Sequence, residues 1–216
     1  MKVKAVIFDF DDTLTDNKRL DLESFRYLGR ILGLYVPSAR EIKELRKTLL
    51  AKDIISWMIK KSARSVPLDL CLKIRNDFLR KENERLIIVK PKVRSALQKL
   101  KSEGCSLFIA TTRTDIGPVK AILRKHRVER FFKNVYSKDS GDKIDIYKKI
   151  LLDPNLVPGE CMVVSNSFQD LSQALDLGMK AVGVHGSYGV DPALRGNMEV
   201  LEDLSKLVFY VKKHCD

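Results

Sequence analysis

The sequence predicts an α/β protein with a doubly wound parallel sheet and an inserted helical unit. After Pro91, short apolar runs alternate with amphipathic segments, which is the pattern of a parallel sheet covered by helices on both faces. Residues 21–84, by contrast, show apolar side chains only at helical spacing. Residues 2–8 form another continuous apolar run and should join the same sheet. The helical segment is therefore an insertion after the first strand.

The expected elements follow from these runs. Strands are predicted at residues 106–110, 134–136, 161–164 and 181–184, and helices at about 92–103, 116–126, 143–152 and 169–177. Within the insertion, Ser38 is placed to cap a helix and Glu41, three residues later, completes a capping box. The predicted division is an α/β core of residues 1–16 and 86–216 and a helical insertion of residues 17–85, built from three or four helices.

Length and composition exclude several classes of protein. The 216 residues suffice for one domain with a sizeable insertion, and 44% hydrophobic and 31% charged residues are typical of a folded domain. No apolar stretch approaches the roughly 20 residues that span a membrane, and the start of the chain lacks a signal-peptide pattern. A cytoplasmic location is expected. The four scattered cysteines, Cys71, Cys105, Cys161 and Cys215, are expected to be reduced and structural.

The net charge of +12 is concentrated in the insertion. Residues 17–85 hold 17 Lys and Arg against 9 Asp and Glu. These basic residues are mixed with acids at helical spacing and have few aromatic neighbours, as on a solvated helix surface. Nucleic acid is therefore not the expected partner. A phosphorylated small molecule is favoured, and the oligomeric state is left open.

Three carboxylates follow the first predicted strand directly. Asp9, Asp11 and Asp12 lie within four positions, and they repel one another at the poorly hydrated end of a buried strand. A cation removes this repulsion, and Mg²⁺ is bound by one or two carboxylates with waters and substrate phosphate. Asp9 and Asp11 project to nearly the same side of an extended segment. The alternative is an acidic loop that only solvates the strand end.

Other predicted strands also end in polar side chains. Thr111 and Thr112 follow the strand at 106–110, and hydroxyls and free N–H groups at a helix start suit phosphate. An ordinary helix cap is the alternative for Thr111, but Asp115 or Thr114 can cap that helix.

Two further strand exits carry lysines and oxygen ligands. Residues 137–145 offer lysines that can neutralise charge developing on a phosphate, and Asn166 and Asp170 follow the strand at 161–164. Parallel sheets place ligands at the carboxyl ends of their strands. All these groups are therefore expected to form one site.

This ordered set resembles the haloacid dehalogenase (HAD) superfamily of phosphotransferases. The first motif of that family, a strand ending D-x-D-x-T, is matched by Asp9, Asp11 and Thr13, and the second by Thr111. The resemblance spans nearly the whole chain, although the insertion matches only in position and character. It is strongest to the phosphoglycolate phosphatase and β-phosphoglucomutase-like members, which carry a helical cap at this point.

The third and fourth motifs of the family are matched less closely. Lys143 fits the third best because residues 141–147 are similar to the family's G-K-P-D-x-x-Y stretch, and Lys138 is the reserve candidate. The fourth, usually G-D-x-x-x-D, corresponds to residues 165–170, with Asn166 and Asp170. Asn166 replaces an acid, which removes a negative charge from the metal site and predicts weaker metal binding. Asp12 stands where the family often has Gly, and no catalytic role is expected for it.

The resemblance implies a Mg²⁺-dependent hydrolase that cleaves phosphate monoesters of a small metabolite. Asp9 would be the nucleophile and form an aspartyl phosphate, and Asp11 would protonate the leaving alkoxide and later deprotonate water. Mg²⁺ would be held by Asp9, the Asp11 carbonyl, Asn166 and Asp170. Catalytic Thr111 and Lys143, together with Thr112, would bind the phosphate oxygens that are not transferred.

Two alternatives remain open on the sequence alone. One is a phosphomutase that uses the same aspartyl phosphate. The other is a catalytically weak HAD-fold binding protein, whose basic insertion contacts nucleic acid or another protein. A dehalogenase is disfavoured, because dehalogenases of this family lack the second acid that Asp11 supplies.

Overall fold

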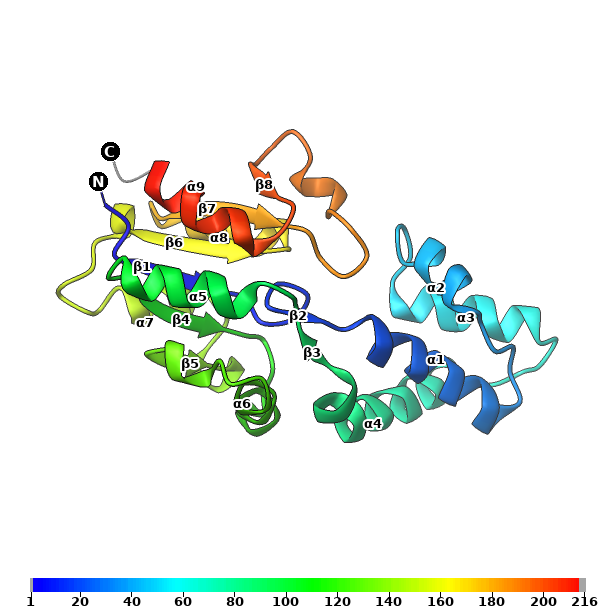
Figure 1. Cartoon of the computed structure of the whole chain (residues 1–216). Coiled ribbons are helices and arrows are strands. Elements are labelled where there is room, and N and C mark those ends of the chain that lie inside the picture. The colour runs from blue at the N-terminus through cyan, green and yellow to red at the C-terminus, as the bar shows by residue number, and fades with distance from the viewer. Residues whose placement is uncertain (1, 214–216) are drawn as a thin grey trace. The chain divides into compact units, whose positions relative to one another are not determined.

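The structure is a computed structural model that describes residues 2–213, and it folds into two compact units (Figure 1). One unit comprises the chain up to Asp16 and from Ile88 onward, and the other comprises Asn17–Ile87. The first contains a six-stranded sheet in the order β5-β4-β1-β6-β7-β8, all neighbours parallel. These strands are β1 (Ala5–Phe8), β4 (Ser106–Ala110), β5 (Asn134–Tyr136), β6 (Cys161–Ser165), β7 (Lys180–Val184) and β8 (Val200–Leu201).

The register of the central strands brings the expected site to one edge. Phe8 at the end of β1 lies opposite Ile109 of β4 on one side and Val164 of β6 on the other. The segments that follow these three strands therefore begin at the same height. The Asp9 N–H continues the pairing by donating to the Val164 carbonyl at 2.9 Å.

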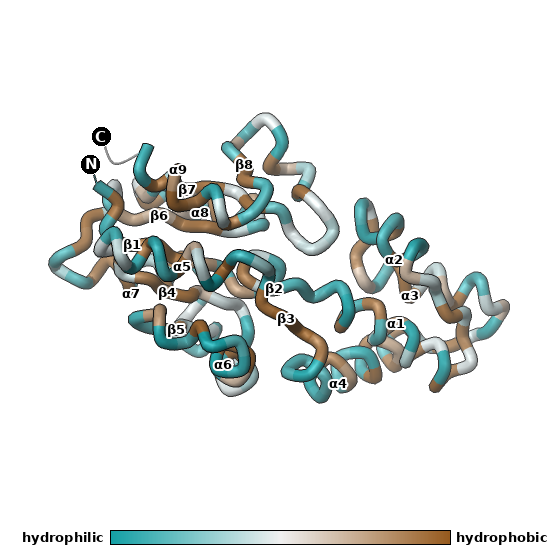
Figure 2. The backbone as a smooth tube through the Cα atoms, viewed as in Figure 1, coloured by the Kyte–Doolittle hydropathy of each residue, from teal (hydrophilic) through white to brown (hydrophobic). Residues whose placement is uncertain are grey.

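Helices cover both faces of this sheet (Figure 1). α5 (Val93–Ser102) packs on α9 (Leu207–Lys213) on one face, and α7 (Lys143–Ile150) packs on α8 (Phe168–Asp176) on the other, while α6 (Ile116–Lys125) connects β4 to β5. Buried strand residues such as Ile7 and Val163 meet Ile146 and Leu171 of the helices in one hydrophobic core. The predominantly hydrophobic colouring of the strands in Figure 2 reflects burial on both faces.

Short 3-10 turns connect several of these elements. They span Glu129–Phe131, Lys138–Ser140, Pro158–Glu160, Pro192–Leu194 and Leu204–Lys206.

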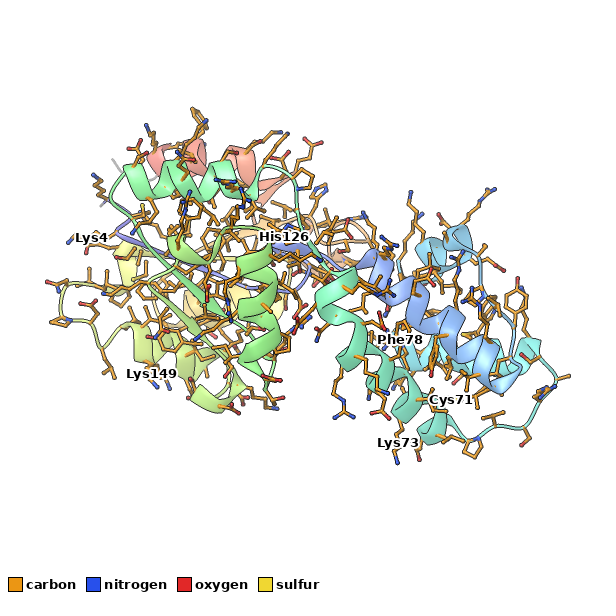
Figure 3. All side chains as sticks on the ribbon, turned by 60° about the horizontal axis from the view of Figure 1, so that its bottom comes forward. Lys4, Cys71, Lys73, Phe78, His126 and Lys149 are labelled. Carbon is orange, nitrogen blue, oxygen red and sulfur yellow. The ribbon has the colours of Figure 1, made fainter. Side chains whose placement is uncertain are left out.

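The second unit consists of helices: α1 (Lys18–Leu32), α2 (Ala39–Leu45), α3 (Ala51–Lys61) and α4 (Leu68–Leu86). The Ser38–Glu41 capping box predicted for α2 is confirmed. On α4, Cys71 is buried within the unit, Phe78 stacks on Tyr27 with ring centroids 4.8 Å apart, and Lys73 is exposed (Figure 3). The buried Asp21 carboxylate accepts hydrogen bonds from both Arg46 and Arg75.

A two-stranded antiparallel ribbon belongs to the first unit and carries the chain to and from the helical one. It pairs β2 (Thr15–Asp16) with β3 (Ile88–Val89), with Thr15 opposite Val89 and Asp16 opposite Ile88. Since β2 begins two residues after Thr13, the ribbon anchors the far end of the acidic segment.

The predicted fold class, a parallel sheet flanked by helices with a helical insertion, is confirmed. The first strand begins at Ala5 and not at residue 2. Cys71, Cys105 and Cys161 are buried free thiols, as expected, and burial raises the pKa of Cys161 to about 11; Cys215 lies outside the described residues. No helix within residues 2–213 is both long and apolar enough to cross a bilayer.

Candidate active site

Asp9 lies directly after β1 with its carboxylate held from two sides. Lys143 Nζ donates to Oδ1 at 2.6 Å and Thr13 Oγ1 lies 3.1 Å from Oδ2. The side chain is only 12% exposed. Burial raises the pKa of Asp9 to about 6 although Lys143 pulls it down, and the neighbouring charges of Asp170 and Asp11 raise it further. A carboxylate with this pKa is largely ionised at neutral pH and carries few hydrating waters.

Lys143 is the first residue of α7, and its side chain is 5% exposed. A capping box between Asp142 and Asp145 fixes the start of this helix. The Lys143 ammonium donates to Asp9 Oδ1 at 2.6 Å and to Asp170 Oδ2 at 2.9 Å. Burial alone lowers the pKa of Lys143, but the two carboxylates outweigh it and raise the pKa above its ordinary value. The reserve candidate, Lys138, is exposed, so the lysine that contacts Asp9 is Lys143.

Asp170 sits in the first turn of α8 and faces the same ammonium. Besides Lys143, its Oδ2 accepts a hydrogen bond from Ser165 Oγ at 2.9 Å. The Asp170 side chain is 14% exposed. Because one lysine is shared by two largely buried carboxylates, this part of the site carries a net negative charge.

Asn166 and Thr13 form the second junction of the site. The Asn166 N–H donates to Thr13 Oγ1 at 3.0 Å, and Thr13 Oγ1 lies 2.9 Å from Asn166 Oδ1. Thr13 is fully buried. The Thr13 hydroxyl therefore lies within hydrogen-bonding distance of side-chain oxygens from two segments, the one after β1 and the one after β6.

Asp11 is engaged by a residue for which the sequence suggested no role. Arg113 donates from Nε to Asp11 Oδ2 at 2.8 Å and from Nη2 to Oδ1 at 2.7 Å, a bidentate ion pair. The Asp11 and Arg113 side chains are 34% and 21% exposed. The Arg113 guanidinium also lies 5.4 Å from the Phe10 ring centroid. Each oxygen of Asp11 thus accepts a hydrogen bond from Arg113.

The two threonines after β4 differ in exposure. Thr111 is buried, and its hydroxyl accepts a hydrogen bond from the Arg113 N–H at 3.3 Å, whereas Thr112 is exposed. The α6 N-cap is Asp115, which accepts from the Gly117 N–H at 2.8 Å. The expectation that Asp115 or Thr114 caps this helix is confirmed for Asp115.

Asp12 adopts a left-handed backbone conformation, with φ of 60°. Gly takes this conformation without strain, and Asp tolerates it better than most residues. The Asp12 carboxylate accepts a hydrogen bond from Ser187 Oγ, and the Asp12 carbonyl accepts one from Lys90 Nζ. Asp12 is therefore a structural junction.

The side chains around Asp9 fit a hard divalent cation. No group of three Asp, Glu, His or Cys side chains suited to a metal occurs within residues 2–213. Oxygens of Asp9 and Asp170 nevertheless converge on the Lys143 ammonium, and oxygens of Asp9 and Asn166 converge on the Thr13 hydroxyl. Two carboxylates and one amide form an oxygen set of the kind Mg²⁺ prefers, with less negative charge than three acids would give.

Comparison with protein families decides the classification. The family model described as haloacid dehalogenase-like hydrolase matches residues 6–184. The chain belongs to this family. It is accordingly a HAD-family hydrolase, and the matched range runs from β1 to the end of β7.

Three individual proteins show how far the similarity extends. PpaX of Caldanaerobacter subterraneus subsp. tengcongensis, named as a candidate pyrophosphatase, is 25% identical and covers 87% of this chain and 84% of its own. A candidate β-phosphoglucomutase from Thermotoga maritima superposes with a TM-score of 0.74 at 23% identity, covering 97% and 99%. A candidate phosphoglycolate phosphatase from Haemophilus somnus 129pt gives 0.76 at 18% identity, covering 97% and 98%. At these identities the two structures show a shared fold.

Sequence reasoning missed Arg113, Lys90 and Ser187. Arg113 stands beside the threonines already singled out, and an arginine in a strand-end loop was the available signal. Lys90 follows a two-residue strand too short for any periodicity. Ser187 lies in a loop rich in glycine, where one hydroxyl carries no distinguishing pattern.

Proposed function

We propose that this HAD-family hydrolase is a Mg²⁺-dependent phosphatase that cleaves a phosphate monoester of a small metabolite through an aspartyl phosphate. The observation that supports this best is the environment of Asp9. Its carboxylate is largely buried, is held between Thr13 and Lys143, and faces the same lysine as Asp170. A fixed, poorly hydrated carboxylate beside a lysine is suited to attack a bound phosphate.

Asp9 acts as the nucleophile. One carboxylate oxygen forms a bond to phosphorus as the bond between phosphorus and the leaving alkoxide breaks, which gives an aspartyl phosphate. Water then attacks this phosphorus, releases inorganic phosphate and regenerates the carboxylate. The fixed position of Asp9 removes the entropic cost of bringing the two reactants together.

Asp11 donates a proton to the leaving alkoxide in the first step and accepts one from water in the second. Arg113 donates one hydrogen bond to each Asp11 oxygen, and the second lone pair of each oxygen can still exchange a proton with the leaving group or with water.

The phosphate oxygens that stay on phosphorus are bound by Lys143, the Thr111 hydroxyl and the Thr112 N–H. Lys143 supplies the positive charge next to Asp9, and the exposed backbone after β4 supplies neutral donors. The buried position of Thr111 fixes where its hydroxyl points.

Asp9, Asp170, Asn166 and the Asp11 carbonyl would hold Mg²⁺. The ion supplies positive charge that offsets the repulsion between the carboxylates and the substrate dianion. Residues 17–85 serve as the helical cap, which sets substrate choice.

A phosphomutase is the second candidate, favoured by the similarity to the candidate β-phosphoglucomutase over nearly the full chain. It differs in the second step only, since the phosphoryl group passes from Asp9 to a sugar hydroxyl in place of water. A requirement for a sugar bisphosphate would identify this reaction.

Phosphate release from an aryl phosphate, measured with and without Mg²⁺, tests the proposal. Metal-dependent release that is lost in Asp9→Asn is the expected result. Release that persists in Asp9→Asn, or its absence with every member of a panel of phosphorylated metabolites, would refute hydrolysis by way of Asp9.

A further inference from the structure

Lys90 links two loops at the carboxyl edge of the sheet. Its ammonium donates to the backbone carbonyl of Asp12, in the segment after β1, and at 2.6 Å to that of His185, in the segment after β7. The strand between these two in the sheet is β6. Lys90 therefore bridges the loops on either side of β6, the strand that Asn166 directly follows.

The β2–β3 ribbon positions Lys90 beside the segment that follows β1. Thr15 lies opposite Val89 in the antiparallel pairing, and one step further the Lys90 N–H donates to the Leu14 carbonyl at 2.9 Å. The backbone of Lys90 is thus fixed beside the end of the acidic segment. From there its side chain reaches the Asp12 carbonyl, so one residue holds this segment at two points.

Ser187 links the same two loops, but here the side chain comes from the loop after β7 and reaches the segment after β1. Its hydroxyl donates to Asp12 Oδ1 and also lies 3.3 Å from Asp16 Oδ1. Neighbouring Gly186 approaches Asn166 so closely that a Cβ added to it would lie 3.1 Å from Asn166 Nδ2. The loop of residues 185–189 is therefore packed against Asn166, whose oxygen faces Thr13.

We propose that Lys90 is a positioning residue of the active site. Its ammonium holds the segment with Asp9 and Asp11 in a fixed relation to the 185–189 loop, and through that loop to Asn166. Hydrogen bonds from an ammonium to carbonyl oxygens are stronger than neutral ones, and loops without such ties open locally at low cost. The catalytic consequence rests on the proposed function, while the ordering of the two loops does not.

Hydrogen exchange and kinetics of three variants test this role. Lys90→Met keeps an unbranched side chain of nearly the same length and removes the ammonium, and Lys90→Arg restores a cation. Lys92→Met is the matched control, since Lys92 is a nearby lysine whose exposed ammonium pairs with Asp203 at 2.9 Å. The probe reaction is Mg²⁺-dependent hydrolysis of an aryl phosphate.

In Lys90→Met, amides of residues 9–16 and 184–189 should exchange faster, while those of α6 and α8 stay unchanged. The kcat should fall roughly tenfold or more with KM little changed, because a small misplacement of the nucleophile is costly. Lys90→Arg should restore much of the slow amide exchange and much of the kcat, and Lys92→Met should change neither of these two quantities.

Unchanged exchange in those two segments would overturn the proposal, as would faster exchange throughout the chain. If the wild-type protein has no phosphatase activity, the exchange result still decides whether Lys90 orders the loops. Failure of the proposed function is thereby distinguished from failure of this inference.

Discussion

The hydroxyl of Thr13 lies 2.9 Å from Asn166 Oδ1, joining residues 153 positions apart. The same oxygen is 3.1 Å from Asp9 Oδ2 and accepts the Asn166 N–H at 3.0 Å. A hydroxyl has one proton to donate, so Asn166 and Asp9 share it. Thr13 thus connects the proposed nucleophile to the position where the family usually has an acid.

Asn166→Asp should tighten Mg²⁺ binding roughly tenfold or more, because the charge of the ligand set controls affinity for a hard cation. Without metal, the new carboxylate faces Asp9, and the melting temperature should fall. Calorimetric titration and thermal melts with and without Mg²⁺ measure both effects. Asn76→Asp, which makes the same change on the exposed surface of α4, is the control. Equal metal affinity in Asn166→Asp and wild type would contradict a role for Asn166 as a ligand.

Thr13→Val should destabilise the protein by about 1–3 kcal/mol, the cost of leaving buried polar groups without a partner. The Asn166 N–H and Asp9 Oδ2 both lose a partner in this variant. Thr13→Ser keeps the hydroxyl and should retain most of the stability and activity. Chemical denaturation measures the difference, and equal losses in the two variants would show that packing of the methyl group matters more than the hydroxyl.

Lys143→Met should abolish metal-dependent hydrolysis and destabilise the metal-free protein by about 3–5 kcal/mol, the usual cost of removing one partner of a buried ion pair. Asp9 and Asp170 then face each other without the shared ammonium. Lys138→Met, at the exposed lysine of the preceding turn, is the matched control and should leave both properties unchanged. The assignment of the phosphate lysine to Lys143 fails if Lys138→Met is the more damaging change.

Activity should decline as the pH falls through about 6, since Asp9 has its pKa raised to about 6 and attacks only when ionised. Mg²⁺ favours the charged form, so more Mg²⁺ should move this limb to lower pH. An acid whose pKa is raised by folding stabilises the protein at low pH and loses that contribution as pH rises through the folded pKa. The free energy of unfolding of the metal-free protein should therefore decrease as the pH rises toward about 6, and that of Asp9→Asn should not. A pH profile independent of Mg²⁺ would speak against the assignment.

The alternating strands and helices of the core could be predicted because each buried strand is a continuous apolar run. The β2–β3 ribbon could not, since its two-residue strands are too short to show a period. The strand β8 is equally short, and α9 follows it beyond the last apolar run that predicts a strand. Ser38 and Glu41 were predictable because a capping box is a local pattern.

In the candidate site, the approach of Asp9 and Asn166 could be predicted because both follow strands of one parallel sheet, whose carboxyl ends lie at the same edge. The hydrogen-bond partners in the site depend on loop conformations and side-chain rotamers, which the order of strands and helices does not determine. Arg113 lies 102 positions from Asp11, and no spacing rule connects a loop arginine to a distant carboxylate. Asp12 illustrates the same limit, since neither its positive φ nor its contact with Ser187 can be read from sequence.

Covalent phosphorylation of Asp9 is the step on which the proposed mechanism depends, and it can be tested by trapping the phosphorylated protein. Asp11→Asn should slow the attack of water but not phosphorylation by an activated aryl phosphate, whose phenolate leaves without a proton. A rapid acid quench after mixing this variant with the aryl phosphate and Mg²⁺ should yield a phosphorylated peptide containing Asp9, detected by mass spectrometry and cleaved by hydroxylamine. We expect this species in Asp11→Asn and none in the Asp9→Asn, Asp11→Asn double variant. Turnover by the wild-type enzyme with no phosphoryl group on Asp9 in any quenched sample, or with the group on another residue, would contradict the mechanism.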